Sequence, residues 1–251
     1  NGDLRKASNI LTEFEGLKST QRQNLIAAYI TRLFLKGGFE IVQQPGGSKP
    51  QMMVKDLPDT AAQDDDNDTK LESELHSFIK EAAGDDRILQ KNELRRWSKY
   101  NGRTLYAWSN RIENVATVWT MKPEEVRQVF GLRKFLKDFT LIKDRGVVEV
   151  KLWNDYLVFA SLYGIADQVM RDFRKVCPEY FRLSSSAEFF NDSATNLLIW
   201  DMINMTSRDF SVAASTYEAS LNSSSSSGGG GSSSWGGGGG YSGGGSGGGG
   251  R

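Results

Sequence analysis

The sequence of 251 residues predicts a mainly α protein with a small β-hairpin and a disordered Gly/Ser-rich tail. Apolar residues recur at steps of three and four through most of the chain, as on one face of an amphipathic helix. The alternating pattern of strands is confined to a short stretch near residues 39–57. From Ser223 to Gly250 the chain is Ser and Gly apart from Trp235 and Tyr241. Such a composition cannot build a core, so we expect residues 222–251 to be a disordered tail.

The first predicted unit covers residues 1–58. Residues 1–20 have weak helical character, whereas 21–36 show a clear apolar face that ends at Gly37-Gly38. Two short strands separated by a Pro-Gly-Gly turn follow within 39–57. Helix, Gly-Gly, strand, turn and strand is the order of a winged-helix unit, so we predict a winged-helix-like unit here.

An acidic linker is predicted over residues 59–69. It contains four aspartates that suggest calcium binding, namely Asp64, Asp65, Asp66 and Asp68. The glycine and the distal glutamate of an EF-hand loop are absent at their required offsets. We therefore expect a solvated linker rather than a metal site.

A second unit, helical and winged-helix-like, is predicted over residues 70–121. Helical periodicity marks 70–82, 92–100 and 105–119, and a short extended link is expected near 87–90. Three helices in this order resemble the core of a helix-turn-helix unit.

A helical C-terminal module is predicted over residues 122–221. A proline followed by acidic residues starts a short helix after 122, and an amphipathic helix follows over 132–142. Residues 149–176 read as one long, largely buried helix. Residues 187–205 suggest short helices that pack back on the core, and a weak turn is expected within 210–221.

Gly164 lies inside the long predicted helix, where glycine costs about 1 kcal/mol relative to alanine. Together with Ala160 and Ala166 it forms a patch of small residues. We expect another backbone to approach closely at this patch. Trp153 is expected in the core, and Pro178 is expected to end the helix.

Three patterns in this region carry a resemblance to a known family. They are Phe135-Leu-Lys-Asp-Phe139, Leu152-Trp153 followed by Tyr156-Leu157, and Tyr163-Gly-Ile-Ala-Asp167. With the Gly-rich tail, they make the chain resemble the C-terminal region of the DUF2207 (YciQ-like) family of uncharacterised predicted membrane proteins. The resemblance implies a whole protein with an extracytoplasmic domain, membrane segments and a cytoplasmic region. It implies a place on the cytoplasmic side of the cell membrane for this chain, and it implies no activity.

Composition sets further limits. Lys plus Arg and Asp plus Glu are equal at 31 each, so net charge gives no overall attraction to nucleic acid or to an anionic membrane. Cys177 is the single cysteine, which excludes an intrachain disulfide. The first residues lack the apolar core of a signal peptide. No apolar run approaches the about 18 residues that span a bilayer, so we expect no transmembrane segment in this chain.

Candidate catalytic groups are few. His76 lies beside core positions of a predicted helix, so we expect a surface or partly buried side chain, and no nucleophile or orienting group is marked nearby. Cys177 follows a helix C-terminus, where the helix dipole raises the pKa of a thiol. One histidine and one cysteine exclude a Cys/His zinc site, and phosphate-loop, dinucleotide and nucleophile-elbow motifs are missing. We expect no catalytic, metal or cofactor-binding residue, and we identify no small-molecule ligand.

One stretch resembles a binding site. It holds five cations interleaved with Trp97 and Tyr100, namely Lys91, Arg95, Arg96, Lys99 and Arg103. In a helix-turn-helix unit this stretch would be the second helix, which reads the major groove of DNA. Anionic lipid headgroups or a protein partner would suit the same surface. We expect a non-enzymatic cytoplasmic interaction or structural region of a membrane protein, with a protein partner or the membrane surface as its contact. The alternative is a winged-helix module that binds nucleic acid.

Overall fold

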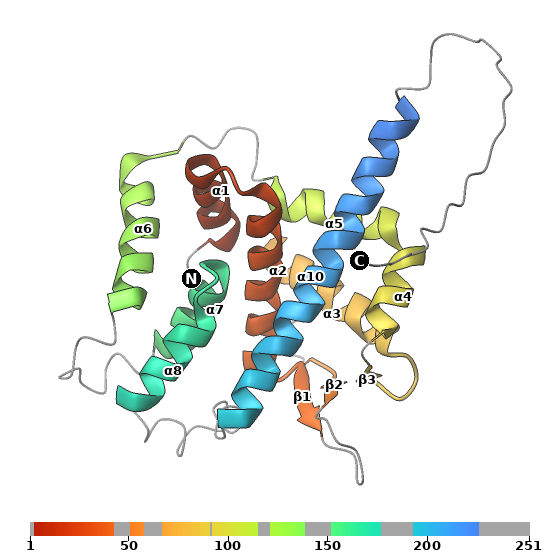
Figure 1. Ribbon diagram of the computed structural model, residues 1–251, viewed down its shortest axis with the longest axis horizontal. Helices are drawn as coiled ribbons and strands as arrows, with labels where there is room; N and C mark the ends of the chain where they lie inside the picture. Colours follow the sequence, from red (N-terminus) through yellow and green to blue (C-terminus); the bar gives the residue numbers. More distant parts are fainter. Residues whose placement is uncertain are drawn as a thin grey trace, which may run out of the picture.

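The computed structural model describes residues 3–42, 51–57, 67–90, 92–114, 121–138, 152–176 and 193–225 (Figure 1). These residues form helices and one three-stranded antiparallel sheet, so the predicted fold class is confirmed. The tail predicted over residues 222–251 starts too early, because residues 222–225 are helical, and residues 226–251 lie outside the described set. Within the described ranges, no helix combines the length and the apolar composition needed to cross a bilayer.

The first half of the chain contains five helices and three strands within the described residues. The helices are α1 Leu4–Glu15, α2 Lys18–Leu35, α3 Asn67–Ala83, α4 Glu93–Tyr100 and α5 Gly102–Glu113. The strands are β1 Phe39–Val42, β2 Gln51–Val54 and β3 Ile88–Leu89. The second half contributes α6 Pro123–Asp138, α7 Trp153–Leu162, α8 Ala166–Val176 and α10 Ser193–Ser225.

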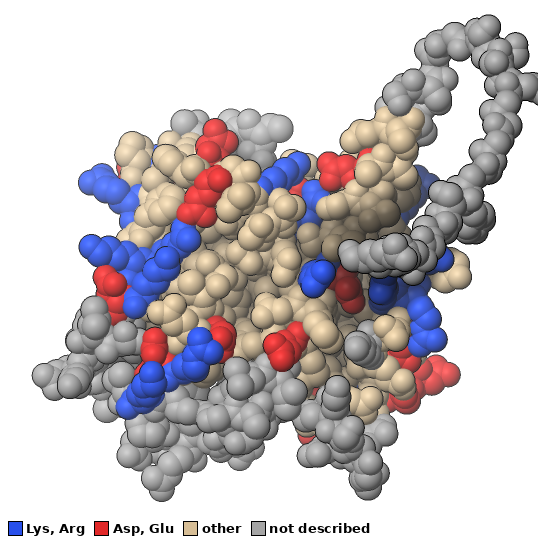
Figure 2. All heavy atoms as spheres, viewed as in Figure 1, with Lys and Arg blue, Asp and Glu red and all other residues tan. Residues whose placement is uncertain are grey.

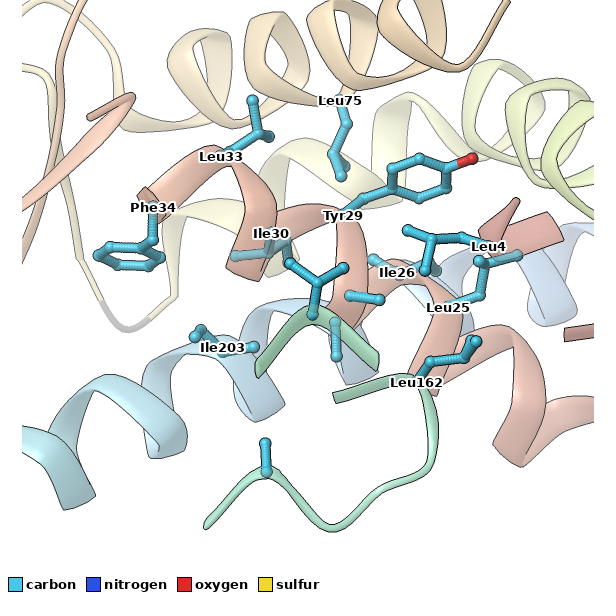
Figure 3. Packing of buried hydrophobic residues seen from close by; sticks show 14 of the residues in the cluster. Leu4, Leu25, Ile26, Tyr29, Ile30, Leu33, Phe34, Leu75, Leu162 and Ile203 are labelled. Carbon is cyan, nitrogen blue, oxygen red and sulfur yellow. The ribbon is translucent and has the colours of Figure 1, made fainter. Parts of the chain in front are cut away.

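The core is organised around α2, which contacts α1, α3, α7 and α10 (Figure 1). Its side chains at Leu25, Ile26, Tyr29 and Ile30 are fully buried. Figure 3 shows these residues together with Leu75 of α3, Leu162 of α7 and Ile203 of α10. A helix that is apolar around most of its circumference is one that neighbours cover on several sides. The helix predicted over 21–36 is therefore confirmed, as the central element of the fold.

α1 is a complete helix where only weak helical character was expected. The carboxylate of Asp3 accepts hydrogen bonds from the backbone N–H groups of Arg5 and Lys6, which caps the N-terminus. Gly16 ends the helix in the left-handed region, with φ of 68°. These two terminal signals and the buried Leu4 and Leu11 stabilise α1 against α2.

The predicted hairpin is confirmed by its register. Phe39 pairs with Val54 and Ile41 pairs with Met52. β3, in the stretch expected to be an extended link, adds to the same sheet by pairing Ile88 with Met53. The sheet thus joins residues from both predicted winged-helix-like units, and the division into such units stays a prediction.

The long helix predicted over residues 149–176 is wrong, because the structure has two helices there. α7 ends and α8 begins around Gly164, whose φ of 68° is a left-handed conformation that favours glycine. The N–H of Ile165 reaches the carbonyl of Ala160 at 2.9 Å, which satisfies an orphan acceptor at the helix end. A Cβ at position 164 would lie 3.2 Å from the side-chain nitrogen of Asn24 in α2. The group that lies close to Gly164 is thus a side chain and not the expected backbone, and the same glycine also ends the helix.

The short helices expected over 187–205 and the weak turn expected within 210–221 are also wrong from residue 193 onward, because 193–225 form the single helix α10 of 33 residues. Residues 187–192 lie outside the described set. Its buried side is continuous through Ile199, Ile203, Phe210 and Ala214, which follow helical spacing. This side packs on α2, α4 and α5. Burial along three helices therefore outweighs the low helix propensity of its many Ser and Thr residues.

Two further boundaries differ from the expected ones. The short helix after 122 and the helix over 132–142 are one helix, α6, as far as Asp138, and residues 139–142 lie outside the described set. One cluster of buried residues runs from Leu4 to Phe210 and includes members of all the predicted helical units. The boundaries of the predicted domains remain predictions.

Candidate binding surface

α4 is fixed to the protein by one side. Leu94 and Ser98 are buried, and Trp97 lies against Phe78 of α3 with ring centroids 5.6 Å apart. The ring centroid of Trp97 also lies 6.4 Å from that of Phe210 in α10. The carboxylate of Glu93 accepts the backbone N–H of Gln90 at 2.9 Å, which holds the entry to the helix. The aromatic anchor leaves the opposite side of α4 directed to solvent.

The solvent side carries four of the five cations singled out in the sequence. Arg95, Arg96 and Lys99 are exposed on α4, and Arg103 is exposed in the first turn of α5. Tyr100 projects among them with 85% of its surface exposed. We call these five residues the α4 basic surface. Lys91, the fifth predicted cation, lies outside the described residues.

The α4 basic surface is poorly neutralised. Arg96 lies 3.9 Å from Glu93, and its side chain is 72% exposed. The other three cations form no ion pair within the described part of the chain. Burial raises the pKa of Asp209 on α10, and the nearby charges of Arg95 and Arg208 oppose that rise. Figure 2 shows blue side chains gathered at the right-hand edge, where Figure 1 places α4.

His76 is buried, which corrects the expected surface or partly buried position. Only 6% of its surface is exposed, and its ring lies 5.5 Å from that of Phe39. Nε2 lies 2.8 Å from the carbonyl oxygen of Lys55 and 3.3 Å from that of Gly38. Both neighbours are acceptors, so Nε2 must carry the proton. Burial lowers the pKa of His76, and the imidazole acts as a neutral link between α3 and the sheet.

A buried ion cluster, not evident from the sequence, joins α2, α5 and α10. The guanidinium of Arg22 is only 3% exposed, and it pairs closely with Glu113. Its Nη1 donates to Ser215 Oγ at 2.9 Å, and its Nη2 lies 3.2 Å from Glu218 Oε2. Hydrogen bonding and attraction to the two glutamates raise the pKa of Arg22, against the opposing effect of burial. We call Arg22, Glu113, Glu218 and Ser215 the Arg22 cluster.

A second buried group of charges joins α2 to α3. Glu72 is 2% exposed and pairs with Arg32 and, at 2.5 Å, with Lys36. Tyr29 donates to Asp68 at 3.3 Å, and its pKa is raised mainly because the phenol is buried. Each carboxylate is thus occupied by a cation or a hydroxyl, and its contacts hold helices together.

Metal binding has no support in the described ranges, where no group of three His, Cys, Asp or Glu side chains is arranged to hold an ion. Asp64, Asp65 and Asp66, like Cys177, lie outside those ranges. Asp68 was expected in the linker, but it belongs to the first turn of α3. The prediction that 59–69 is linker is therefore wrong at its end, because α3 begins at Asn67.

Comparison with known proteins identifies a family for part of the chain. Residues 111–173 match the family model described as predicted membrane protein (DUF2207) C-terminal domain. Comparison with solved structures gives no match, and comparison with curated proteins gives none either. The matched segment includes α6 and α7 and lies outside α4. The resemblance seen in the sequence is confirmed over residues 111–173, which are similar to the C-terminal domain of the DUF2207 family of predicted membrane proteins.

Proposed function

We propose that this chain is a non-enzymatic, cytoplasmic interaction region of a membrane protein, and that its α4 basic surface lies against anionic lipid headgroups. One observation carries the proposal. Four cations and Tyr100 project from α4 and the start of α5, and of these cations only Arg96 lies within ion-pair distance of a carboxylate among the described residues, at 3.9 Å. The description of the matched family as a predicted membrane protein favours a lipid surface as the anionic partner.

The charges suit a membrane surface. A Lys or Arg near an anionic leaflet contributes about 1 kcal/mol to binding, and the attraction falls off within a Debye length of about 8 Å at physiological salt. The zero net charge of the whole chain therefore does not oppose binding through one local surface. Tyr100 adds an aromatic ring with a polar tip, the type of side chain that is enriched at the boundary between lipid and water.

A second basic helix shows why α4 is preferred. α6 exposes Arg127, Lys134 and Lys137, but it begins with Glu124 and Glu125 and ends at an aspartate. Along α4 the single acidic residue is Glu93. Mixed charges repel an anionic surface as much as they attract it, so α6 makes a natural control for α4.

The shifted pKa values support a non-enzymatic role. Burial raises the pKa of Tyr163 and lowers that of His76. The hydroxyl of Tyr163 donates to the carbonyl of Val129 at 2.9 Å, and His76 holds the sheet as described above. Each group is explained by packing and by a hydrogen bond to the backbone, which is the arrangement of a structural residue.

Vesicle sedimentation tests the proposal. We expect the chain to bind vesicles of phosphatidylcholine mixed with phosphatidylserine, to ignore pure phosphatidylcholine, and to be released as salt rises. The variant Arg95→Ala/Arg96→Ala/Lys99→Ala should bind about 100-fold more weakly, from about 1 kcal/mol per cation. The variant Arg127→Ala/Lys134→Ala/Lys137→Ala removes the same charge from α6 and should bind as the parent chain does. Equal losses in the two variants, or no binding to anionic vesicles, would refute the proposal.

Nucleic acid is the second candidate, because α4 follows α3 in the position of the second helix of the predicted helix-turn-helix unit. Its cations Arg95, Arg96 and Lys99 are exposed, as a helix that reads the major groove requires. A titration with random duplex DNA at low salt separates the candidates. Binding to the duplex that is lost in the α4 triple variant, together with no binding to anionic vesicles, would replace the membrane proposal with the nucleic-acid one.

A further inference from the structure

An open groove of about 510 Å³ lies between the start of α2 and α10. Ser19, Thr20 and Gln23 of α2 line one side of it. The α10 side consists of residues that share one face of the helix, namely Arg208, Ser211, Val212, Ser215, Thr216 and Ala219. In Figure 1, α10 crosses the front of the molecule beside α2. The volume lies within the range of about 300–1,000 Å³ that is typical of small-molecule sites, and most of the lining side chains are polar.

Ser211 places a buried hydroxyl without a partner in this groove. Only 6% of its surface is exposed, and it belongs to the groove lining. Among the described residues, its hydroxyl makes no hydrogen bond. Thr216 differs, because its hydroxyl already donates to the carbonyl of Val212 at 2.8 Å. Buried polar groups are normally hydrogen-bonded, so the hydroxyl of Ser211 favours a ligand that brings an acceptor into the groove.

Ser215 supplies a second donor, one helical turn after Ser211. Nη1 of the buried Arg22 donates to Ser215 Oγ at 2.9 Å, which fixes the hydroxyl from the side of the core. Because Oγ accepts this bond, its own proton remains available to a further acceptor. No such acceptor is found in the part of the chain that the structure describes. Residues four apart lie on the same face of a helix, so the two hydroxyls can serve one ligand group.

Arg208 gives the groove an uncompensated positive charge. Its side chain is exposed, and it forms no ion pair within the described ranges. The two carboxylates of the Arg22 cluster do not oppose this charge, because the guanidinium of the cluster and Lys18 balance them. Asp209, the next residue of α10, does not belong to the groove lining. The groove therefore favours an anion.

The start of α2 supports the same sign of charge. Leu17 precedes the helix and provides no side-chain cap, and the first turn contains no acidic residue. Gln21 donates its N–H to the carbonyl of Leu17 at 2.9 Å, and the N–H groups of the three residues before it have no acceptor among the described residues. Such groups, at the positive end of the helix dipole, attract negative charge. The exposed hydroxyls of Ser19 and Thr20 lie in the same turn.

We propose that this groove binds a phosphate monoester group, with Arg208 paired to the phosphate and the hydroxyls of Ser211 and Ser215 donating to its oxygens. A phosphate carries several acceptor oxygens and a charge near −2, which matches a guanidinium accompanied by hydroxyl donors. Val212, which is 55% exposed, offers an apolar contact for the carbon part of the ligand. The groove contains none of the residues of the α4 basic surface, so the proposal is independent of the function proposed above.

Calorimetric titration of the whole chain with glycerol 3-phosphate tests the site. We expect saturable binding at one site, and no binding of glycerol. Arg208→Gln and Ser211→Ala should each weaken binding about 10-fold or more, the loss expected for one hydrogen bond to a charged group. Two matched controls should bind as the parent chain does, namely Arg127→Gln on α6 and Ser220→Ala on α10 outside the groove. No binding of glycerol 3-phosphate, or binding that survives both groove variants, would overturn the proposal.

Vesicles identify the source of the phosphate group, because phosphatidic acid presents a phosphate monoester at a lipid surface. The background is Arg95→Ala/Arg96→Ala/Lys99→Ala, which removes the attraction of α4 and leaves the groove intact. Binding of this variant to phosphatidylcholine vesicles that contain phosphatidic acid, lost on adding Arg208→Gln, would support the site with a lipid as its ligand. Binding of glycerol 3-phosphate without binding to these vesicles would support it with a soluble ligand. Binding of both probes that is unchanged by Arg208→Gln would contradict the proposal.

Discussion

The Arg22 cluster and the α4 basic surface use the same kind of side chain in opposite ways. Arg22 is 3% exposed and meets two carboxylates and a hydroxyl supplied by α5 and α10. Arg96 is 72% exposed and approaches one glutamate at 3.9 Å. A buried charge must be paired, because removal from water costs several kcal/mol. An exposed charge has no such need, because water solvates it, and its ion pair contributes little to stability.

The largest expected effect comes from removing the buried guanidinium of the Arg22 cluster. Arg22→Ala leaves Glu113 and Glu218 close together without their guanidinium, and we expect the free energy of unfolding to fall by about 3–5 kcal/mol. Urea denaturation measures the loss. Arg96→Ala is the matched control and should change stability by less than about 0.5 kcal/mol. A loss below about 1 kcal/mol for Arg22→Ala would show that the cluster does not hold the three helices.

Two glutamates on α3 also differ in burial, and so test the same comparison. Glu72 is 2% exposed beside Arg32 and Lys36, whereas the side chain of Glu74 is 38% exposed beside Arg111. We expect Glu72→Ala to cost about 3 kcal/mol, because it leaves Arg32 of α2 and Lys36 at the end of α2 without the carboxylate that both contact. Glu74→Ala should cost less than about 1 kcal/mol, although Arg111 makes two hydrogen bonds to it. Equal losses of unfolding free energy in the two variants would mean that burial does not determine how much each ion pair contributes to stability.

His76 is expected to add a smaller, pH-dependent effect. Burial holds the pKa of folded His76 below the ordinary 6.5, so the unfolded chain binds the proton first as pH falls. The contribution of neutral His76 is complete above about pH 6.5 and decreases as pH falls toward the lower, folded-state pKa. One proton gives a slope of at most about 1.4 kcal/mol per pH unit. His76→Gln should flatten the stability curve between about pH 7.5 and 5.5, and an unchanged slope would contradict this role.

Local patterns in the sequence account for much of the fold. The apolar face of 21–36, the alternation of 39–57 and the periodicity of 70–82 each determine an element through neighbours a few residues away. The break at Gly164 was not predictable from that pattern. It depends on a left-handed φ and on Asn24 in another helix. The length of α10 likewise depends on burial against helices distant in sequence.

The candidate site shows the same division. Helical spacing placed Arg95, Arg96 and Lys99 on α4, and the structure finds them exposed. The ion pairs of Arg22 could not be predicted from the sequence, because its two carboxylate partners lie 91 and 196 residues away in the chain. His76 was placed too near the surface for a related reason, since its two carbonyl partners come from the sheet region.

The most direct test of the central claim is hydrogen exchange with and without anionic vesicles. Our account predicts that amides of α4 and the first turn of α5 become protected when phosphatidylserine vesicles are added, while those of α6 do not change. The variant Arg95→Ala/Arg96→Ala/Lys99→Ala should lose this protection and keep the slow exchange of the buried α2. Protection centred on another surface, or none in α4 while the chain is bound to vesicles, would contradict the account.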